Sequence, residues 1–255
     1  MRLLKVLSVI CLGMMVSGLG ELNASATMRI IPEVYEEYIK YLQPENESKE
    51  EVKEEIVEDI NEATYNPDNL RELSNLSKEQ ISRILEGNDL QVLADTYYEM
   101  ENKYNINAIF LMALNMEESG HGRSSLAVYS NNLGGIKSRD GGYASFESWD
   151  QCLDYISNLI DEMYLTEGGA YYNGTSVYGV NVKYCVGGTW AENLNTIAGE
   201  ILYKSEIVTA DLIAENTEKN EAAKKEELVK KIDIKANESL NKVATKTNSV
   251  EHHNF

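Results

Sequence analysis

The sequence is poor in several residue types, and each shortage narrows the possible functions. Only three of its 255 residues are Cys and three are His, and they form no cluster with metal-ligand spacing, so we expect no structural zinc and no other cofactor. Lys and Arg number 23 against 42 Asp and Glu, for a net charge of −19. Nucleic-acid binding depends on clustered cations, so we expect no nucleic-acid partner. The same imbalance argues against attachment to an anionic surface by charge alone.

Long apolar runs are equally scarce, and the one that stands out is at the start. Residues 1–26 begin with Arg2 and Lys5, continue with an apolar run, and end in Ala-Ser-Ala. This order is typical of a secretory signal peptide that is removed by cleavage. The alternative is an uncleaved anchor, but the run is shorter than the ~20 residues of a membrane span. We expect no stable membrane span after cleavage.

After the signal, two cysteines remain, Cys152 and Cys185. Outside the cell they have the conditions to form a disulfide. Two free, half-buried thiols fit the sequence equally well, because spacing alone does not establish pairing.

Two charged segments flank the central part of the chain. Residues 27–67 include an acid-rich run at 45–62, which is typical of a solvated helix or a flexible spacer, and we interpret them as an acidic, partly helical linker. Residues 206–255 are rich in Lys, Glu, Ala and Asn and predict a helical or disordered tail. Either segment offers a surface for a protein partner in a larger envelope assembly.

Residues 68–205 have the periodicity of a folded helical domain. Ser77 and Gln80 have capping-box spacing at the start of the first expected helix. Strand-like sequence is confined to residues 135–146, enough for one small hairpin that turns at Asp140. The predicted fold class is therefore α+β and mostly helical. The expected helices cover approximately residues 77–87, 89–104, 107–119, 148–164, 175–183 and 190–204.

The segment around Glu118 contains the strongest chemical signal. The helix expected at 107–119 is apolar almost all round, which indicates burial, yet it ends in Glu117 and Glu118 before Gly120. A carboxyl against apolar walls has a raised pKa, and a protonated carboxylic acid is what cleavage of a glycosidic bond requires. Glu118 is thus a candidate general acid facing a glycine-rich cleft. The alternative is an ordinary solvated helix end.

Several segments of this domain stand in an order that is typical of one known family. They are NLRELSNLSKEQISRIL, YNINAIFLMALNMEESG, ALNMEESGHGRSSLAVYSNNLGGIK, YASFESWDQCLDYI and VKYCVGGTWAENLNTI. In this order, over about residues 68–205, they resemble the bacterial glucosaminidase family of cell-wall autolysins (glycoside hydrolase family 73).

The resemblance implies a lysozyme-like fold with a small β-hairpin lobe over a sugar-binding groove. It also implies cleavage of the peptidoglycan glycan strand, most simply by an N-acetylglucosaminidase that is secreted and associated with the cell wall. A muramidase or a lytic transglycosylase on the same scaffold is an alternative. A further alternative is a non-catalytic wall-binding component of a conjugation or phage-type envelope machine.

The resemblance also implies roles for individual residues. Glu118 matches the family's catalytic acid, and Tyr184 matches a tyrosine that lines the catalytic site. Many relatives carry a second acid in a longer hairpin, and here the candidates are Asp140, alternatively a turn former, and Glu147, alternatively a helix first-turn residue. In a third route the substrate's own N-acetyl oxygen attacks, with Tyr184 orienting it or a water. His121 stands where a Trp is frequent, and it either tunes the pH response or serves as a turn residue.

Aromatic and amide side chains supply candidates for sugar binding. Tyr143, Tyr171, Tyr172 and Tyr178 are expected to stack on pyranose faces, with core packing as the alternative. Asn131 and Asn132 are expected either to bond the N-acetyl groups of the substrate or to brace their own loop.

Overall fold

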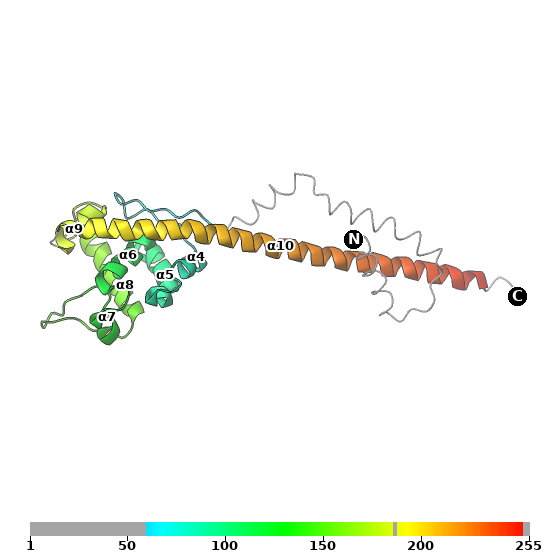
Figure 1. The fold of residues 1–255 in the computed structure, drawn as a ribbon, viewed down its shortest axis with the longest axis horizontal. Helices are drawn as coiled ribbons and strands as arrows, with labels where there is room; N and C mark the ends of the chain where they lie inside the picture. The colour runs from blue at the N-terminus through cyan, green and yellow to red at the C-terminus, as the bar shows by residue number, and fades with distance from the viewer. Residues whose placement is uncertain (1–59, 186–187, 252–255) are drawn as a thin grey trace. The chain divides into compact units, whose positions relative to one another are not determined.

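The computed structural model describes residues 60–185 and 188–251. The predicted signal peptide, most of the predicted linker and the last four residues lie outside this part of the chain. The elements in chain order are α4 (Lys78–Ile84), η2 (Asp89–Leu93), α5 (Ala94–Tyr104), α6 (Ala108–Ser119), α7 (Ser125–Ser130), α8 (Trp149–Leu159), η3 (Ile160–Leu165), α9 (Val177–Tyr184) and α10 (Trp190–Glu251) (Figure 1).

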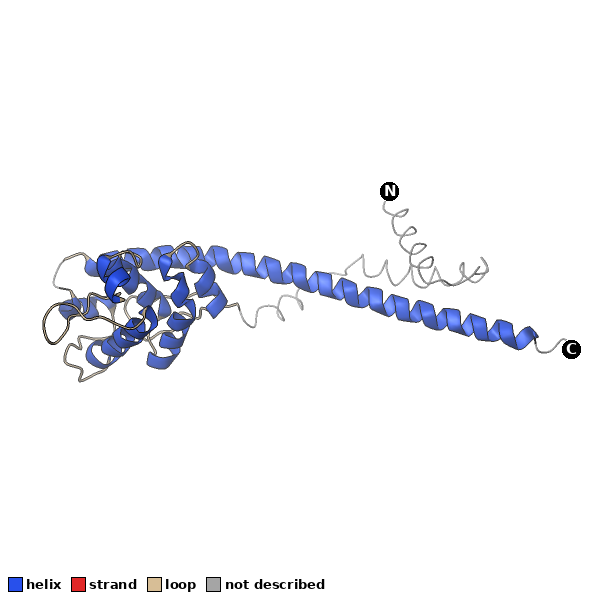
Figure 2. Ribbon diagram, turned by 90° about the horizontal axis from the view of Figure 1, so that it is seen from below, coloured by secondary structure: helices blue, strands red, loops and turns tan. Residues whose placement is uncertain are grey.

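The structure confirms the mostly helical fold class. Figure 2 shows the described residues as helices joined by loops. Two details differ from the expectation. The segment expected as one helix at 89–104 begins with the 3-10 turn η2, because the Asn88 side chain accepts a hydrogen bond from the backbone N–H of Leu90. The short helix α7 was not expected; it starts where the Ser124 hydroxyl accepts from the backbone N–H of Ala127. In the described chain, no helix has both the length and the apolar character of a membrane span.

The core is arranged around α6. Every residue of this helix is buried except Glu117 and Glu118, as its all-round apolar sequence predicted. Asn107 caps its start by accepting from the backbone N–H groups of Ile109 and Phe110, and Gly120 ends it in a left-handed conformation at φ 57°. The helix α5 packs against α4, α6 and α8. Only the last turn of α6 therefore brings side chains from the core to the surface.

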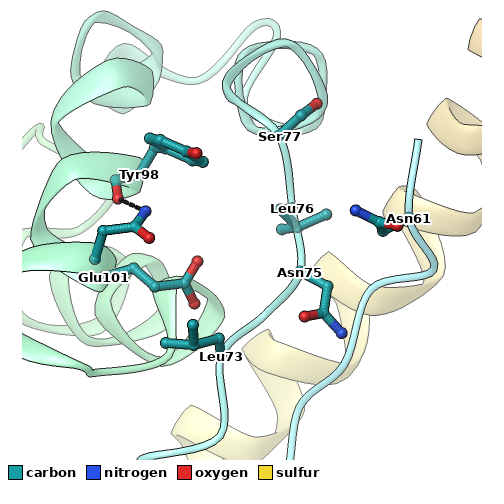
Figure 3. A pocket seen from close by; sticks show the side chains of 8 residues that line it. Asn61, Leu73, Asn75, Leu76, Ser77, Tyr98 and Glu101 are labelled. Carbon is teal, nitrogen blue, oxygen red and sulfur yellow. Dashed lines mark hydrogen bonds between the residues drawn. The ribbon is translucent and has the colours of Figure 1, made fainter. Parts of the chain in front are cut away.

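A buried carboxylate secures the start of α6. Glu101, on α5, is 3% exposed and accepts hydrogen bonds from the backbone N–H groups of Ser74 (2.6 Å) and Ala108 (2.8 Å) and from the Ser74 hydroxyl (2.9 Å). Glu101 also reaches a small pocket of about 230 Å³, opposite Asn61 and Asn75 (Figure 3). The carboxylate thus ties α5, the segment before α4 and the first turn of α6 together.

The predicted hairpin is present in a reduced form. Lys137 and Tyr143 form an antiparallel bridge, and the backbone N–H of Ala144 donates to the Ile136 carbonyl at 2.9 Å. Within the described residues this bridge is the only strand pairing. The β-lobe therefore amounts to one turn of chain with its tip near Asp140.

The helix α8 changes its winding before it ends. Residues Ile160–Leu165 form the π-helix η3, which is wider than an α-helix and is often found at functional sites. The change brings Tyr164 against the ring of Tyr184. Both cysteines that follow the predicted signal are free, with Cys152 buried and Cys185 half-buried, so the disulfide alternative is wrong.

The last helix belongs to two units. The described residues up to Thr217 pack as a compact unit, and α10 contributes the buried side chains Val208 and Leu212 to its core. The helix continues without a break through residue 205, the predicted end of the folded helical domain. Beyond Thr217, in the second unit, i,i+4 ion pairs join Glu226 to Lys230 and Glu227 to Lys231.

Candidate active site

Glu118 lies half-buried in the last turn of α6 and is held by the first turns of α10. The indole Nε1 of Trp190 donates to Glu118 Oε1 at 2.8 Å. Trp190 is 5% exposed, so this hydrogen bond is shielded from solvent. The neighbouring Glu117 accepts from the amide of Asn193 at 2.8 Å. The two acids therefore have different partners on one helix, and Glu118 has the drier surroundings.

The pKa of Glu118 is affected by burial, by a hydrogen bond, by a neighbouring charge and by the helix end. Burial raises the pKa of the Glu118 carboxyl, the hydrogen bond from Trp190 opposes this, and the charge of Glu117 adds a further rise. The position at the C-terminal end of α6 also disfavours a negative charge, because helix carbonyls converge there. Glu118 therefore keeps its proton to a higher pH than an exposed glutamate does.

Tyr184 lies beside this carboxyl. Its ring stacks on Trp190, with centroids 5.0 Å apart and an interplanar angle of 28°. Its hydroxyl is buried and has no hydrogen-bond partner among the described residues. Burial raises the pKa of Tyr184 and the charge of Glu118 raises it further, so the hydroxyl stays protonated. A buried donor without a partner destabilises the folded protein by ~1–3 kcal/mol. Such donors are rare in folded proteins, and here a bound ligand would supply the acceptor.

A continuous row of aromatic rings leads from solvent to Glu118. Ring centroids are 5.1 Å apart between Tyr171 and Tyr164, 5.6 Å between Tyr164 and Tyr184, and 5.0 Å between Tyr184 and Trp190. Tyr171 at its outer end is 40% exposed. We call these four residues the aromatic row. Of the four tyrosines predicted to bind sugar, Tyr171 is therefore connected to Glu118 through packed rings.

The other three tyrosines have no ring contact with this row in the described part of the chain. Tyr143, Tyr172 and Tyr178 are exposed, and the Lys137 ammonium lies 3.5 Å from the ring centroid of Tyr143. Within residues 60–185 and 188–251, no ring contact or hydrogen bond joins any of the three to Glu118. They are available for a ligand, and their role in sugar binding stays a prediction.

Asn131 and Asn132 brace their loop. The Asn132 side chain, 1% exposed, donates to the carbonyls of Ile136 (2.9 Å) and Ala144 (2.8 Å) and accepts from the backbone N–H of Ile136. The amide of Asn131 donates to the Phe146 carbonyl at 3.0 Å. These bonds fix both ends of the short hairpin. Contact of Asn131 and Asn132 with the N-acetyl groups of a substrate stays a prediction.

The two candidates for a second acid are both exposed. The backbone N–H of Asp140 donates to the Ser138 hydroxyl at 3.4 Å in the hairpin turn. The backbone N–H of Glu147 donates to the Gln151 side chain at 2.7 Å, just before α8. Across the described chain neither carboxylate is bonded to Glu118. Both positions fit the turn and helix-entry alternatives, and a role as catalytic base stays a prediction.

The structure adds residues that the sequence interpretation missed. The sequence interpretation has Trp190 as the start of a helix and as part of a segment similar to the family, with no role at the site, and it gives Tyr164 and Asn193 no role. For Trp190 a signal existed, because a buried indole N–H usually has an acceptor. For Tyr164 no local signal existed, since its position depends on the π-helical turn.

The site lies within a segment that matches a known family. Residues 94–206 match the glucosaminidase family, described as mannosyl-glycoprotein endo-beta-N-acetylglucosaminidase. The match includes Glu118, Tyr184 and Trp190. It confirms the resemblance that the sequence motifs indicated from residue 94 onward, and the predicted part before residue 94 lies outside the match.

Individual proteins also show similarity to this chain. Two Streptococcus pneumoniae proteins, from strains TIGR4 and R6, carry the provisional name endo-beta-N-acetylglucosaminidase and are each 28% identical to this chain over 141 residues, 52% of its length. The chain spans only about a fifth of these relatives, 21% and 20% of their lengths. Among solved structures, S. aureus autolysin E in complex with the disaccharide NAG-NAM matches at 16% identity and a TM-score of 0.46, covering 59% of this chain and 78% of that one.

Proposed function

We propose that this protein, whose residues 94–206 match the glucosaminidase family, is a peptidoglycan hydrolase that cleaves the β-1,4 glycosidic bonds of the glycan strand. The bond cut is the N-acetylglucosaminyl-β-1,4-N-acetylmuramic acid bond, as in an N-acetylglucosaminidase, with Glu118 as the general acid. We further propose that residues 1–26 direct export, so that the enzyme acts on the cell wall from outside. The observation that supports this proposal best is the half-buried carboxyl of Glu118 between Trp190 and the unpaired hydroxyl of Tyr184.

Glu118 protonates the glycosidic oxygen as the bond breaks. Burial keeps the proton on the carboxyl before the reaction, and proton transfer leaves a carboxylate there. The Trp190 N–H then donates to that carboxylate, and a hydrogen bond to a charged acceptor is stronger than one to a neutral acceptor. Trp190 therefore orients the acid and also stabilises the carboxylate that proton transfer leaves on Glu118.

Tyr184 supplies the second polar group. Its free hydroxyl is positioned to donate to the N-acetyl oxygen of the substrate or to orient a water. In the described chain, no hydrogen bond, ion pair or ring contact brings Asp140 or Glu147 to Glu118 or Trp190, whereas the ring of Tyr184 stacks on Trp190 and the charge of Glu118 acts on the pKa of Tyr184. We therefore favour attack by the substrate's own N-acetyl oxygen over direct base catalysis by Asp140 or Glu147.

Dye release from purified peptidoglycan tests the enzyme directly. Glu118→Gln keeps an acceptor for Trp190 but removes the proton donor, so we expect the rate to fall at least ~100-fold. The control is Glu117→Gln, which changes the adjacent acid held by Asn193 and should keep the rate within about threefold of wild type. Wild-type protein that releases no dye above blank would refute the enzyme and favour a wall-binding component.

The identity of the new chain end distinguishes the possible enzymes. After borohydride reduction of the digest, an N-acetylglucosaminidase leaves reduced glucosamine ends. Reduced muramic acid would indicate a muramidase, and a 1,6-anhydro product would indicate a lytic transglycosylase. Either result would replace the proposed bond specificity while leaving Glu118 as the acid.

A further inference from the structure

A larger pocket, of about 370 Å³, lies beside the C-terminal end of α6. Its volume is within the range of ~300–1,000 Å³ that is usual for small-molecule sites. The apolar side chains that line it come from α4, α6 and α10, and the turn after α6 adds His121. These apolar residues are Ile84, Met116, Ile197 and Ile201. Glu118 does not line this pocket, although Met116 and His121 lie two and three residues from it along the chain.

The polar groups around this pocket carry both signs of charge. Arg123 and Lys204 are cationic, and Glu86 and Glu200 are anionic. Arg123 uses its Nε to donate to Asp89, and Lys204 donates to the Glu86 main-chain carbonyl at 3.2 Å. In the described part of the chain, the carboxylates of Glu86 and Glu200 have no hydrogen-bond or ion-pair partner. The pocket therefore suits a ligand that has apolar side chains and both an anionic and a cationic group.

The pocket and the proposed catalytic acid share one face of α10. Trp190 and Asn193 hold Glu118 and Glu117, and the same face continues with Ile197, Ile201 and Lys204 at helical spacing. At ~1.5 Å of rise per residue, the pocket extends from about 10 to about 20 Å along α10 from Trp190. Trp190 and Ile201 are buried on this face, so a ligand that reaches both regions would pass over Asn193 and Ile197, which are more exposed.

We propose that this pocket binds the peptide stem of peptidoglycan, the short peptide carried by the muramic acid residues. The inference rests on the proposed function, because it assumes that the glycan strand lies at Glu118. A stem contains small apolar residues, free carboxylates and, in its diamino acid, an amine. An extended peptide of three to five residues spans ~10–17 Å, which is the separation between Trp190 and the pocket. The apolar residues then contact the isoleucines, the carboxylates face Arg123 and Lys204, and the amine faces Glu86 and Glu200.

The chemistry of the pocket favours a peptide over a sugar. Its apolar surface is aliphatic, whereas the exposed aromatic ring that leads to Glu118 belongs to the aromatic row. A glycan without stems offers no ammonium group to Glu86 or Glu200. The smaller pocket near Glu101 is lined by amides and by Leu73 and Leu76, and it lacks this arrangement of charges.

Ligand binding by the full chain tests the proposal. The chain carries Glu118→Gln so that no ligand is consumed, and calorimetry compares a peptidoglycan tetrasaccharide that keeps its stems with the same tetrasaccharide after stem removal. Adding Arg123→Gln and Lys204→Gln together should weaken binding of the stem-bearing ligand five- to tenfold and change binding of the stem-free ligand less than twofold.

The control is Lys224→Gln, an exposed lysine further along α10, which should change the binding of neither ligand. Glu200→Gln, at an exposed position, should weaken the binding only of ligands whose stems contain the diamino acid.

The outcomes separate this inference from the proposed function. Equal losses for both ligands, or no loss for either, would overturn the stem site even if the wild type digests peptidoglycan. Binding of the free stem peptide that is lost in the Arg123→Gln, Lys204→Gln chain would support the site even if the wild type releases no dye. In that case the hydrolase would be refuted and the stem site would stand.

Discussion

The two ends of α6 place a carboxyl group in contrasting surroundings. Glu101, next to the first turn, accepts three hydrogen bonds, two of them from backbone N–H groups. Glu118, in the last turn, accepts one, from Trp190. Burial raises the pKa of both carboxyls, and at Glu101 the hydrogen bonds from Ser74 and Ala108 work against that rise. The rise caused by burial is therefore counteracted by several donors at one end of the helix and by a single donor at the other.

Helix electrostatics add to this difference. N–H groups converge at the start of a helix and favour a negative charge, whereas carbonyl groups converge at its end and disfavour one. Glu101 stabilises the fold as an acceptor, whereas Glu118 is the carboxyl for which we propose proton transfer to the substrate. The comparison shows that burial alone does not mark a catalytic acid; the number of donors and the helix end also decide.

The largest effect on stability is expected at Glu101. Glu101→Ala leaves the Ser74 and Ala108 N–H groups without their acceptor, and we expect the free energy of unfolding to fall by about 3 kcal/mol. For a domain of this size that lowers the Tm by about 6–12 °C. Denaturant or thermal unfolding measures the change. Glu99→Ala, an exposed position on the same helix, is the matched control and should cost less than about 1 kcal/mol. If the two variants have equal stability, Glu101 does not hold the start of α6.

Removal of the hydroxyl group near each acid should have opposite effects on stability and on the rate of hydrolysis. Tyr184→Phe removes an unpaired buried hydroxyl, so it should leave stability unchanged or raise it by about 1 kcal/mol, while peptidoglycan hydrolysis falls about 100-fold. Ser74→Ala removes the hydroxyl that donates to Glu101 and should cost about 1–2 kcal/mol with no loss of rate per folded molecule. Full activity in Tyr184→Phe would exclude this hydroxyl from the reaction.

A smaller effect is expected at Trp190. Trp190→Phe keeps the aromatic row but removes the N–H that lowers the pKa of Glu118. The pKa of Glu118 should therefore rise, and the protonated form should persist to higher pH. The alkaline limb of the pH–rate profile should then move to higher pH. The rate should fall about tenfold, because one hydrogen bond to the developing carboxylate is lost. An alkaline limb that does not move would show that Trp190 acts only through packing.

Much of the fold could be predicted because its signals are local. The apolar character of α6, the capping residue Ser77 and the terminating Gly120 each lie within or next to the helix they define. Glu118 was identifiable for the same reason, since its position at the end of a buried helix can be read from neighbouring residues. The split of the expected helix at 89–104 follows from the local Asn88 cap, which competes with regular helix formation.

The rest of the site depends on contacts between distant residues. Trp190 and Glu118 are 72 positions apart, so the sequence did not indicate that the indole N–H is the partner of the acid. Tyr164 reaches the aromatic row because η3 has π-helical winding, which hydrophobic periodicity at 3.6 residues per turn does not reveal. The amides of Asn131 and Asn132 were recognised as either ligands or braces, and only the three-dimensional arrangement shows the bonds that they make.

The central claim concerns the proton on Glu118, and an NMR titration of that carboxyl measures it directly. The full chain, labelled with ¹³C at glutamate side chains, is titrated with pH, and the Glu118 signal is assigned by its loss in Glu118→Gln. We predict a titration midpoint above the ~4.3 of an ordinary glutamate. A midpoint at or below that value would mean that Glu118 is charged whenever the enzyme works, and would contradict its role as the general acid.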